Sequence, residues 1–347
     1  MQKINLYFTR SFSVNFYFIN SVKNYFKNKN IETKIIVSHP DKDSPTLMAA
    51  DIALIEPSYN SEKNRLFYQN VCIKHDIDCI IPGESSILTL IKLDSFIHQS
   101  KPKVLTSQNF DFINTLKSKT ETYKLFASKN ISNLHIPFYN LVKDTVTFEK
   151  TYKEIIENKT MACFKPDSSQ GGAGFRIIDN DISPNEAIYG YASIRNTYNY
   201  YLDKLKQLKN FQPLILLEYL SGPEYSLDCF GNGKHLFFCG IREKTNKKRR
   251  LINNDVLKKI AEDIQSTFEF SNLYNIQIKE EKNKYHLLEI NPRYSAGSYI
   301  YELEGFHLLG KAIDLALNNI KIEQLEIKPI LIQSIESYIK LHSNYPH

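Results

Sequence analysis

The sequence of 347 residues has little glycine (12) and little proline (13), and no apolar run approaches the roughly 20 residues that span a bilayer. Because helix and strand breakers are scarce, most of the chain should lie in regular elements, and a local glycine cluster is informative. The five cysteines form no CxxC pair and are odd in number, so neither a disulfide framework nor a zinc site is indicated. The N-terminus has no signal-peptide pattern, and the nine histidines lack spacings such as HExxH. We therefore expect a cytoplasmic protein with reduced thiols and no membrane partner.

The composition is that of a globular protein. Hydrophobic residues make up 42% of the chain, including 22 Tyr and 21 Phe, and charged residues make up 24%. These values exclude a fibre or a disordered chain, and the length suggests two or three domains. The net charge of +6 would suit a polyanionic ligand, but over this length it is a mild excess that a Lys-rich solvated surface explains better.

The first hundred residues alternate short β-rich runs with helical segments. Strands are expected at 4–8, 34–37, 52–55, 79–81 and 104–105, and Ile19, Val22 and Phe26 mark one face of the first helix. This alternation predicts a parallel sheet covered by helices. No GxGxxG occurs, which disfavours a dinucleotide-binding site.

The pattern changes near Ser118. Ser118-Lys119-Thr120-Glu121 fits a capping box that begins a helix, and Asn130 marks its stop. Beyond Pro137 hairpin patterns predict an antiparallel α+β region, with a surface helix at 183–210. The basic run 247–250 is expected to be a loop, either over a polyanionic site or simply solvated.

A glycine cluster follows one of these strands. The segment 165–174, KPDSSQGGAG, uses three of the twelve glycines within four positions. Its backbone N–H groups could surround phosphate oxygens, and Lys165 could pair with a phosphate. A plain glycine-rich hairpin explains the segment equally well, and a P-loop is excluded because no helix opens here.

A second candidate site lies at LEIN, residues 288–291. Glu289 and Asn291 are two apart on a predicted strand, so both should project from one face and offer oxygens to a hard cation. Gln277 would join them only if the turn between 281 and 284 has an odd loop length. The alternative is an edge strand with solvated polar residues.

A third segment, 216–225, is an apolar strand that ends in Glu218, turns at Gly222-Pro223 and returns with Glu224. Its acceptors could meet an adenine amino group and ribose hydroxyls. A hairpin with two surface glutamates is the alternative.

Taken together and in this order, these segments resemble the ATP-grasp superfamily, in particular proteins similar to the carbamoyl-phosphate synthase large subunit and related carboxylate-amine ligases. The resemblance covers nearly the whole chain. It implies an α/β and α+β fold in which residues 1–106 form a parallel pre-ATP-grasp domain. Residues 107–330 would form the ATP-grasp domain, with a mobile lid at about 140–215, and residues 331–347 would pack on the core.

The resemblance also implies roles for individual residues. Those that would bind ATP are Lys119, Lys165, Ser168, Ser169, Gly171, Gly172, Gly174, Glu218, Tyr219, Leu220 and Glu224. Those that would hold Mg²⁺, or Mn²⁺ in its place, are Gln277, Glu289 and Asn291. Arg293 and Arg242 would act in catalysis, and Glu84, Ser295 and Gly297 would contact the substrate.

The implied activity is ATP-dependent ligation. A small carboxylate, such as an amino acid, would become an acyl phosphate and react with an amine to form an amide or peptide bond, releasing ADP and phosphate. The open alternatives are a carboxylate-thiol ligase, an ATP-binding pseudoenzyme and a nucleic-acid-binding protein, for which no aromatic-basic RNA motif is present. The expected partners are small-molecule substrates, with a homodimer as a compatible assembly.

Overall fold

The computed structural model describes residues 2–58, 61–83, 86–91, 102–158, 161–168, 172–183, 185–186, 194–245, 248–318 and 320–333. The chain forms two compact units. Unit 1 contains residues 1–110, 226–275 and 291–347, and unit 2 contains residues 111–225 and 276–290. The chain therefore passes between them four times. The three-part division predicted from the sequence stays a prediction.

Unit 1 begins with a parallel five-stranded sheet of order β3-β2-β1-β4-β5. Its strands are β1 (Lys3–Phe8), β2 (Glu32–His39), β3 (Ile52–Ile55), β4 (Cys79–Ile81) and β5 (Lys103–Val104). The connecting helices are α1 (Asn15–Asn28), α2 (Pro45–Met48), α3 (Ser61–Lys74) and α4 (Ile87–Ile91). The parallel sheet expected from the alternating pattern is thus confirmed.

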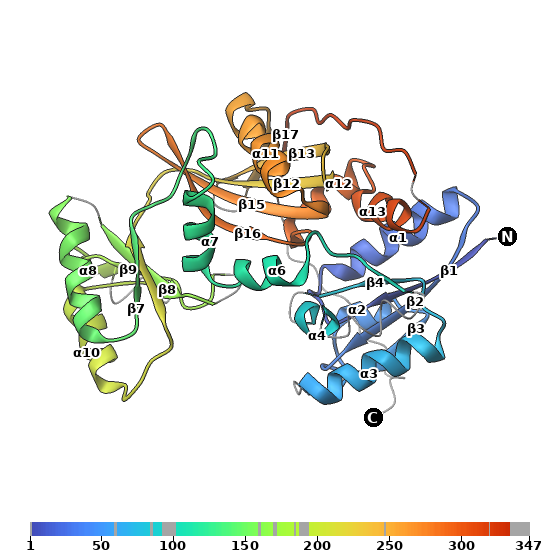
Figure 1. Cartoon of the computed structure of the whole chain (residues 1–347), viewed down its shortest axis with the longest axis horizontal. Coiled ribbons are helices and arrows are strands. Elements are labelled where there is room, and N and C mark those ends of the chain that lie inside the picture. The colour runs from blue at the N-terminus through green and yellow to red at the C-terminus, as the bar shows by residue number, and fades with distance from the viewer. Residues whose placement is uncertain are drawn as a thin grey trace. The chain divides into compact units, whose positions relative to one another are not determined.

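Side-chain alternation gives this sheet two apolar faces. Leu6, Phe8 and Val37 pack with Phe18 and Phe26 of α1, whereas Tyr7, Ile36 and Ile80 pack with Tyr68 and Val71 of α3 on the other face. Figure 1 shows α1 and α3 on opposite sides of the strands. Both faces are covered, as a parallel sheet requires.

The rest of unit 1 is built from later parts of the chain. They contribute β12 (Glu224–Asn232), β13 (Leu236–Thr245), β14 (Lys248–Ile252), β17 (Ile330–Gln333), α11 (Asp255–Phe268), the 3₁₀ turn η1 (Ala296–Ser298), α12 (Tyr299–Leu303) and α13 (Leu308–Asn318). Phe238, Tyr301 and Leu309 belong to the same core as α1 and the parallel sheet. Unit 1 is therefore held together by residues that lie far apart in the sequence.

Unit 2 contains a second five-stranded sheet, of order β10-β9-β8-β11-β7. Its strands are β7 (Tyr139–Val142), β8 (Ala162–Pro166), β9 (Arg176–Ile178), β10 (Arg195–Asn196) and β11 (Leu214–Glu218). Helices α8 (Thr145–Glu157) and α10 (Tyr198–Gln207) lie against it (Figure 1). The rings of Phe148 and Tyr201 contact the ring of Phe164. Helices α6 (Phe110–Leu116) and α7 (Lys119–Ala127) precede this sheet in the chain.

A third, seven-stranded sheet has the order β17-β14-β13-β12-β15-β16-β6. It adds β15 (Ser271–Glu281), β16 (Lys284–Asn291) and β6 (Leu134–His135). The unit boundaries at 275 and 290 fall within β15 and β16.

Two segments differ from the sequence-based expectation. Arg195 and Asn196, inside the stretch predicted as helix, form β10 and pair with Ile177 and Ile178. Residues 248–250 of the basic run are not a loop, because they pair with both β13 and β17 in strand β14. In both cases strand pairing overrides what the local polarity favours. Among the described residues, no helix is long and apolar enough to cross a bilayer.

The substitution Gly83→Ala should destabilise unit 1. Gly83 follows β4, and a Cβ atom built there would lie 1.5 Å from the backbone oxygen of Arg10. Because backbone must move to admit it, we expect a loss of about 1–3 kcal/mol, measured by thermal or urea unfolding. Ile73→Ala removes a side chain that is 68% exposed in the same unit and should change stability by less than about 0.5 kcal/mol. Equal stability of the two variants would contradict this account.

Candidate functional site

Asp167 links the start of helix α7 to the end of strand β8. Its carboxylate accepts hydrogen bonds from the Ser118 hydroxyl (2.6 Å), the Thr120 backbone N–H (2.9 Å) and the Thr120 hydroxyl (2.7 Å). Its carbonyl oxygen accepts from the backbone N–H of Lys119 (3.1 Å) and from Lys119 Nζ (3.3 Å). The N-cap half of the predicted capping box is present as well, since the Ser118 hydroxyl accepts from Glu121 N–H, whereas the Ser118 N–H donates to the Thr115 oxygen. Lys119, which is 5% exposed, is thereby held beside the glycine hairpin.

The glycine hairpin joins β8 to β9. These strands are antiparallel, with Ala162 opposite Ile178 and Phe164 opposite Arg176. Gly172 and Gly174 have φ angles of +75° and +74°, a region that disfavours other residues. A Cβ atom on Gly174 would also lie 2.6 Å from the Pro166 ring. The loop backbone thus depends on these glycines.

Lys165 faces Glu289 within unit 2. The distance from Lys165 Nζ to the Glu289 carboxylate is 3.9 Å, and their side chains are 13% and 22% exposed. Lys165 comes from β8 and Glu289 from β16, so this pair joins two sheets. The structure therefore brings together a residue from the glycine segment and a residue from the predicted metal segment.

The β15–β16 hairpin contains a shift of register. Its turn has two residues, Lys282 and Asn283, both with positive φ, as in a tight hairpin. Near the turn, Tyr225 bonds Glu280 and its ring contacts Tyr285, so residues 280 and 285 share a face. Farther along, Asn291 contacts Asn275 at 3.5 Å, so these two share a face. In a regular antiparallel hairpin, the numbers of two facing residues always add up to the same value. That sum is 565 for residues 280 and 285 but 566 for residues 275 and 291. A β-bulge, which adds one residue to one strand, produces such a difference.

The loop length bears on where Gln277 points. By the sequence-based condition, Gln277 lies on the same face as Glu289 only if the loop length is odd. The observed loop has two residues, and simple alternation from it would turn Gln277 away from Glu289. The loop length therefore does not meet the condition that the sequence set for Gln277, and its grouping with Glu289 and Asn291 stays a prediction.

The predicted adenine-binding segment follows β11. Glu218 accepts a hydrogen bond from the Phe138 backbone N–H (3.0 Å), and the backbone N–H of Glu218 donates to the Phe138 oxygen (3.0 Å). The N–H of Tyr219 donates to Met161 (2.7 Å), and Leu220 is 4% exposed. Glu218 thus fixes the strand end, which the sequence did not suggest. Glu224 is half-buried at the start of β12.

Two cations that sequence reasoning missed lie near the Tyr219 ring. Lys279 Nζ is 5.3 Å from the ring centroid, and the Arg195 guanidinium is 6.0 Å from it. Arg195 is also paired with Asp179 at 3.0 Å. Lys279 could have been found by strand periodicity, since it lies two residues beyond Gln277, whereas Arg195 could not be found because its strand was predicted as helix.

Cys163 lies near these charges but is not a nucleophile. Burial raises the pKa of its thiol to about 12, with Lys165 and Lys279 acting in the opposite direction. A thiol with this pKa stays protonated near neutral pH. The site therefore offers charge and hydrogen bonds rather than covalent chemistry from this side chain.

The predicted catalytic and substrate residues of the C-terminal segment lie in unit 1. Arg242 is 4% exposed and pairs with Asp228 at 2.6 Å and with the Ser295 hydroxyl at 2.8 Å. A Cβ atom on Gly297 would lie 2.2 Å from the Arg242 guanidinium. Ser295 and Gly297 thus contact Arg242 itself. The Arg293 guanidinium lies 4.9 Å from the centroid of the Phe12 ring.

Three predicted residues, Glu84, Ser169 and Gly171, lie outside the described part of the chain, and Ser168 is exposed. Within the described ranges, no cluster of three or more His, Cys, Asp or Glu side chains could hold a metal ion. The set Gln277, Glu289 and Asn291 contains one carboxylate and two amides. Such oxygen donors fit Mg²⁺, which commonly takes only one or two protein carboxylates and completes its shell with phosphates and water.

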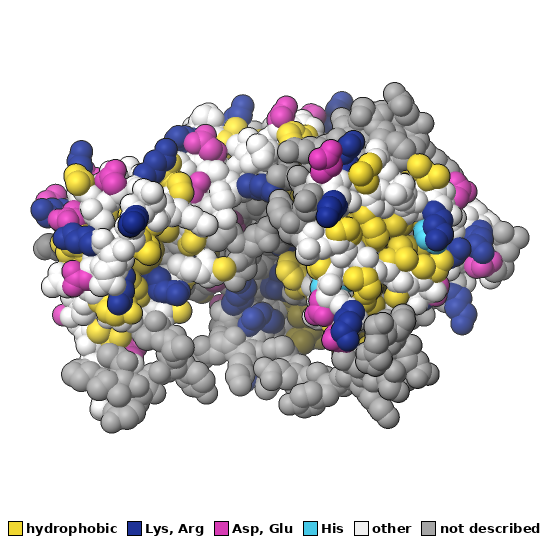
Figure 2. Space-filling model, turned by 90° about the horizontal axis from the view of Figure 1, so that it is seen from below, with side chains coloured by type: hydrophobic (Ala, Val, Ile, Leu, Met, Phe, Trp, Pro, Cys, Tyr) yellow, Lys and Arg dark blue, Asp and Glu magenta, His cyan; other side chains and the backbone are white. Residues whose placement is uncertain are grey.

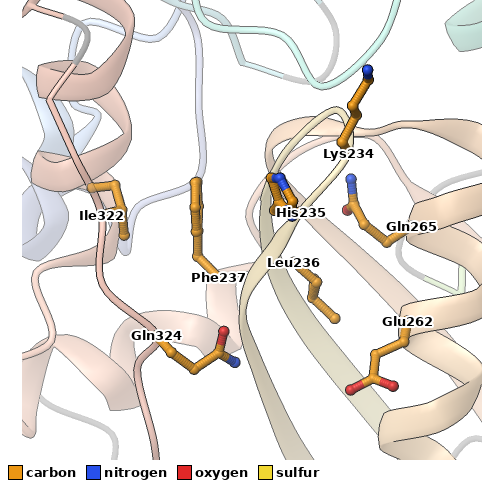
Figure 3. A pocket seen from close by; sticks show the side chains of 8 residues that line it. All are labelled: Lys234, His235, Leu236, Phe237, Glu262, Gln265, Ile322 and Gln324. Atoms are coloured by element: carbon orange, nitrogen blue, oxygen red, sulfur yellow. The ribbon is translucent and has the colours of Figure 1, made fainter.

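A surface pocket in unit 1 is separate from these residues. It has a volume of about 370 Å³ and is lined by Lys234, His235, Leu236, Phe237, Glu262, Gln265, Ile322 and Gln324 (Figure 3). Gln265 is already engaged, since its amide nitrogen donates to the Gly233 and Phe270 oxygens and its oxygen accepts from Tyr274. None of the residues predicted to bind ATP or metal lines this pocket.

Comparisons with known proteins identify similar sequences and folds. Residues 210–337 match the family described as ATP-grasp in the biosynthetic pathway with Ter operon. No curated protein matches the sequence. Among solved structures, N5-carboxyaminoimidazole synthetase from Staphylococcus aureus complexed with ADP is 14% identical, with 96% of this chain and 82% of that chain covered and a TM-score of 0.64.

Two further structures are similar over most of the chain. L-amino acid ligase from Bacillus licheniformis is 9% identical, with 92% of this chain and 75% of that chain covered and a TM-score of 0.64. The biotin carboxylase domain dimer of Hydrogenobacter thermophilus 2-oxoglutarate carboxylase, in complex with MgADP, ADP and bicarbonate, is 14% identical. That match covers 93% of this chain and 70% of that chain, with a TM-score of 0.65.

The substitution Asp167→Ala should weaken both the α7 cap and the position of Lys119. It leaves the Ser118 and Thr120 groups without their buried acceptor, which should lower stability by about 1–3 kcal/mol, measured by urea unfolding. Asp144→Ala is the matched control, because Asp144 caps α8 in the same unit through Thr147 N–H. If Asp167→Ala were no more destabilising than this exposed cap, the linking role of Asp167 would be wrong.

The substitution Glu281→Gln should reveal a pH-dependent tie. Burial alone would raise the pKa of Glu281, but hydrogen bonds from Ser221 and Gly222 hold it below its ordinary value of 4.5. A carboxyl with a depressed pKa stabilises the fold above 4.5, and this contribution is lost as the pH falls through the folded-state pKa. The wild-type protein should melt above Glu281→Gln at pH 7, and the difference should shrink below pH 4.5. A Tm difference between the wild-type protein and Glu281→Gln that stays constant down to pH 3 would refute this role of Glu281. The control is Glu157→Gln, on the exposed surface, which should have the wild-type Tm both at pH 7 and below pH 4.5.

Proposed function

Because the chain has the ATP-grasp fold, as its sequence motifs predicted, we propose that it is an ATP-dependent ligase. Its reaction would activate a small carboxylate, such as an amino acid or a related metabolite, as an acyl phosphate. An amine would then attack to form an amide or peptide bond, with release of ADP and phosphate.

One observation carries this proposal. Lys165 Nζ lies 3.9 Å from the Glu289 carboxylate, beside the glycine hairpin that ends at Gly174. A lysine, a glycine-rich loop and a carboxylate on one side of unit 2 are the groups needed to hold a triphosphate and its metal ion. Lys119, held by Asp167 at the start of the same hairpin, adds a second cation.

The chemistry begins at the substrate carboxylate. One of its oxygens attacks the ATP γ-phosphorus, the bond to the bridging oxygen breaks, and ADP leaves. This replaces oxide, a poor leaving group, with phosphate. Phosphoryl transfer needs positioning and charge neutralisation rather than a protein nucleophile, and the buried, protonated Cys163 is consistent with that requirement. Lys119, Lys165 and Arg293 are the residues that we assign to offset the negative charge.

In the second step the amine nitrogen attacks the acyl carbon. The carbon–oxygen bond to phosphate breaks, phosphate leaves, and the nitrogen loses a proton. Water would compete with the amine at this point, so the intermediate must be shielded. The segment at about 140–215, which contains the glycine hairpin, is the part of the chain that we assign to this lid.

The residues that would hold a magnesium ion are Glu289, Asn291 and Gln277. When bound, Mg²⁺ neutralises phosphate charge and orients the γ-phosphoryl group. Their hard oxygen donors support this assignment. Glu218, Tyr219, Leu220 and Glu224 remain the proposed adenine and ribose contacts, through backbone groups as well as side chains.

The similar structures support the general proposal of an ATP-dependent ligase. One is complexed with ADP, one with MgADP, and one is named an L-amino acid ligase. The identities of 9–14% leave the carboxylate and the amine to be found by experiment. The cytoplasmic location suggested by the cysteines and a homodimer both belong to this proposal.

Nucleic-acid binding receives less support. Residues 248–250, the described part of the basic run, are built into strand β14, and Arg250 pairs with Glu243 at 3.6 Å. Basic and acidic side chains are intermingled at the left of Figure 2, and in unit 2 Lys206 pairs with Glu149 and Lys150 with Glu154. A mixed surface of this kind gives no continuous track for a phosphate backbone.

The double substitution Glu289→Ala with Asn291→Ala should abolish turnover, because it removes two of the three proposed metal ligands. ADP release should fall by at least about a hundredfold, measured with ATP, Mg²⁺ and pairs of amino acids in a coupled assay. Mass detection of the product identifies the substrates. Glu304→Ala, at an exposed carboxylate of α12's C-terminal end, is the control and should retain full turnover.

Each contrary result has a defined meaning. ADP release at the wild-type rate by the double variant would refute the metal assignment. ADP formed with no new amide in any mixture would point to a kinase-like or thiol-ligase reaction. ATP-independent retention of nucleic acid that is lost at high salt would favour the nucleic-acid class.

A further inference from the structure

A buried polar network in unit 1 surrounds Asp228. Its carboxylate accepts from Arg242 Nε (2.6 Å) and NH2 (3.3 Å), from the Ser295 hydroxyl (2.8 Å) and from Asn275 Nδ2 (2.9 Å). Asp228 and Arg242 are each 4% exposed, and Asn275 is 0% exposed. Four hydrogen bonds use the full acceptor capacity of one carboxylate.

Arg242 is the buried cationic partner of this carboxylate and donates two hydrogen bonds to it. Burial alone would lower the pKa of the guanidinium, but the charge of Asp228 and their hydrogen bonds raise it above its ordinary value. A pair of this kind stays charged, because removing either partner would leave the other charge buried and uncompensated. Asp228 is therefore an acceptor only.

The acceptor role of the Asp228 carboxylate sets the orientation of the Asn275 amide. Since Asp228 can only accept, Asn275 must turn its amide nitrogen toward it, and that nitrogen also lies 3.3 Å from the Leu227 oxygen. The Asn275 amide oxygen then accepts from Nδ2 of Asn291 at 3.5 Å. Flipping Asn275 would bring its oxygen against a carboxylate and a carbonyl, so the flipped state is disfavoured.

The fixed orientation of the Asn275 amide therefore also orients the amide of Asn291, at the end of β16. With its nitrogen toward Asn275, the Asn291 amide presents its oxygen on the opposite side. A hard divalent cation binds an amide through oxygen and not through nitrogen. At 3.5 Å the last hydrogen bond is long, and it favours this orientation because the flipped Asn291 amide would set its oxygen against the Asn275 oxygen.

We propose that Asn275 is a positioning residue that orients Asn291 for metal binding, and that the Asp228–Arg242 pair acts through it. This inference rests on the proposed function, since it concerns a ligand of the same magnesium site. It gives Arg242 a role as a buried counter-ion, in place of the catalytic role predicted from the sequence. Asn275 itself, fully buried, touches neither metal nor substrate.

The test is metal binding by Asn275→Leu, which keeps a similar volume and removes the amide. The probe is Mn²⁺ titrated into the full chain with a non-hydrolysable ATP analogue, with free Mn²⁺ followed by electron paramagnetic resonance. We expect Mn²⁺ to bind about tenfold more weakly than in the wild-type protein, the lower end of the effect seen when the support of a ligand is removed. Asn275→Ser keeps a donor for Asp228 but is too short to reach Asn291, so it should give the same loss if Asn275→Leu does not fold.

Gln265→Leu separates positioning from general destabilisation. Gln265 is also a buried amide of unit 1, 1% exposed, with three hydrogen bonds away from Asn291. It should lower the Tm as much as Asn275→Leu and leave Mn²⁺ binding unchanged. If the wild-type protein bound no Mn²⁺ with the analogue, the proposed function would fail and this inference with it. If the wild-type protein bound Mn²⁺ and the folded Asn275 variants bound it equally well, the inference alone would be overturned.

Discussion

The carboxylate of Asp167 is the interaction on which the proposed phosphate-binding part of unit 2 depends. One residue caps helix α7, holds Lys119 through its carbonyl and begins the loop that leaves β8 two positions after Lys165. Because Asp167 is 7% exposed, its charge must be satisfied locally, and the Ser118 and Thr120 groups do so without using either lysine side chain. Lys119 Nζ donates to the Asp167 carbonyl oxygen, and Lys165 Nζ faces the Glu289 carboxylate.

The other side of the proposed site contains a pair of opposite charges. Lys165 is paired at 3.9 Å with Glu289, a distance at which the pair is loose. A polyanion and a divalent cation arriving together could exchange this contact for two stronger ones, because each side chain would gain a partner of opposite charge. In unit 1, by contrast, Arg242 and Asp228 lie at 2.6 Å and are almost fully buried, which marks a permanent pair. Separation and burial thus distinguish the pair that we assign to ligand binding from the pair that is committed to structure.

Much of this arrangement follows from local patterns in the sequence. The strands of the parallel sheet, the N-cap at Ser118 and the two-residue spacing of Glu289 and Asn291 depend on short-range periodicity and on known end preferences. The remainder depends on pairing between distant segments. Asp228 and Asn275 meet because β12 and β15 are neighbours in the sheet, and Arg195 reaches Tyr219 because β10 adds to β9. Nothing adjacent to these residues in the chain encodes those partners.

The shift of register in the β15–β16 hairpin has a consequence for related sequences. Deleting a single residue of the hairpin between its turn and the Asn275–Asn291 contact, outside the segment LEIN, would restore plain alternation, and the residues beyond the deletion would turn to the other side of the sheet. Every residue of the segment LEIN would still be present, and a search for that segment would still find it. The spacing of 12 residues between Gln277 and Glu289 is therefore as much a part of the site as the residues themselves, and homologues that preserve the letters but change that length should be grouped separately.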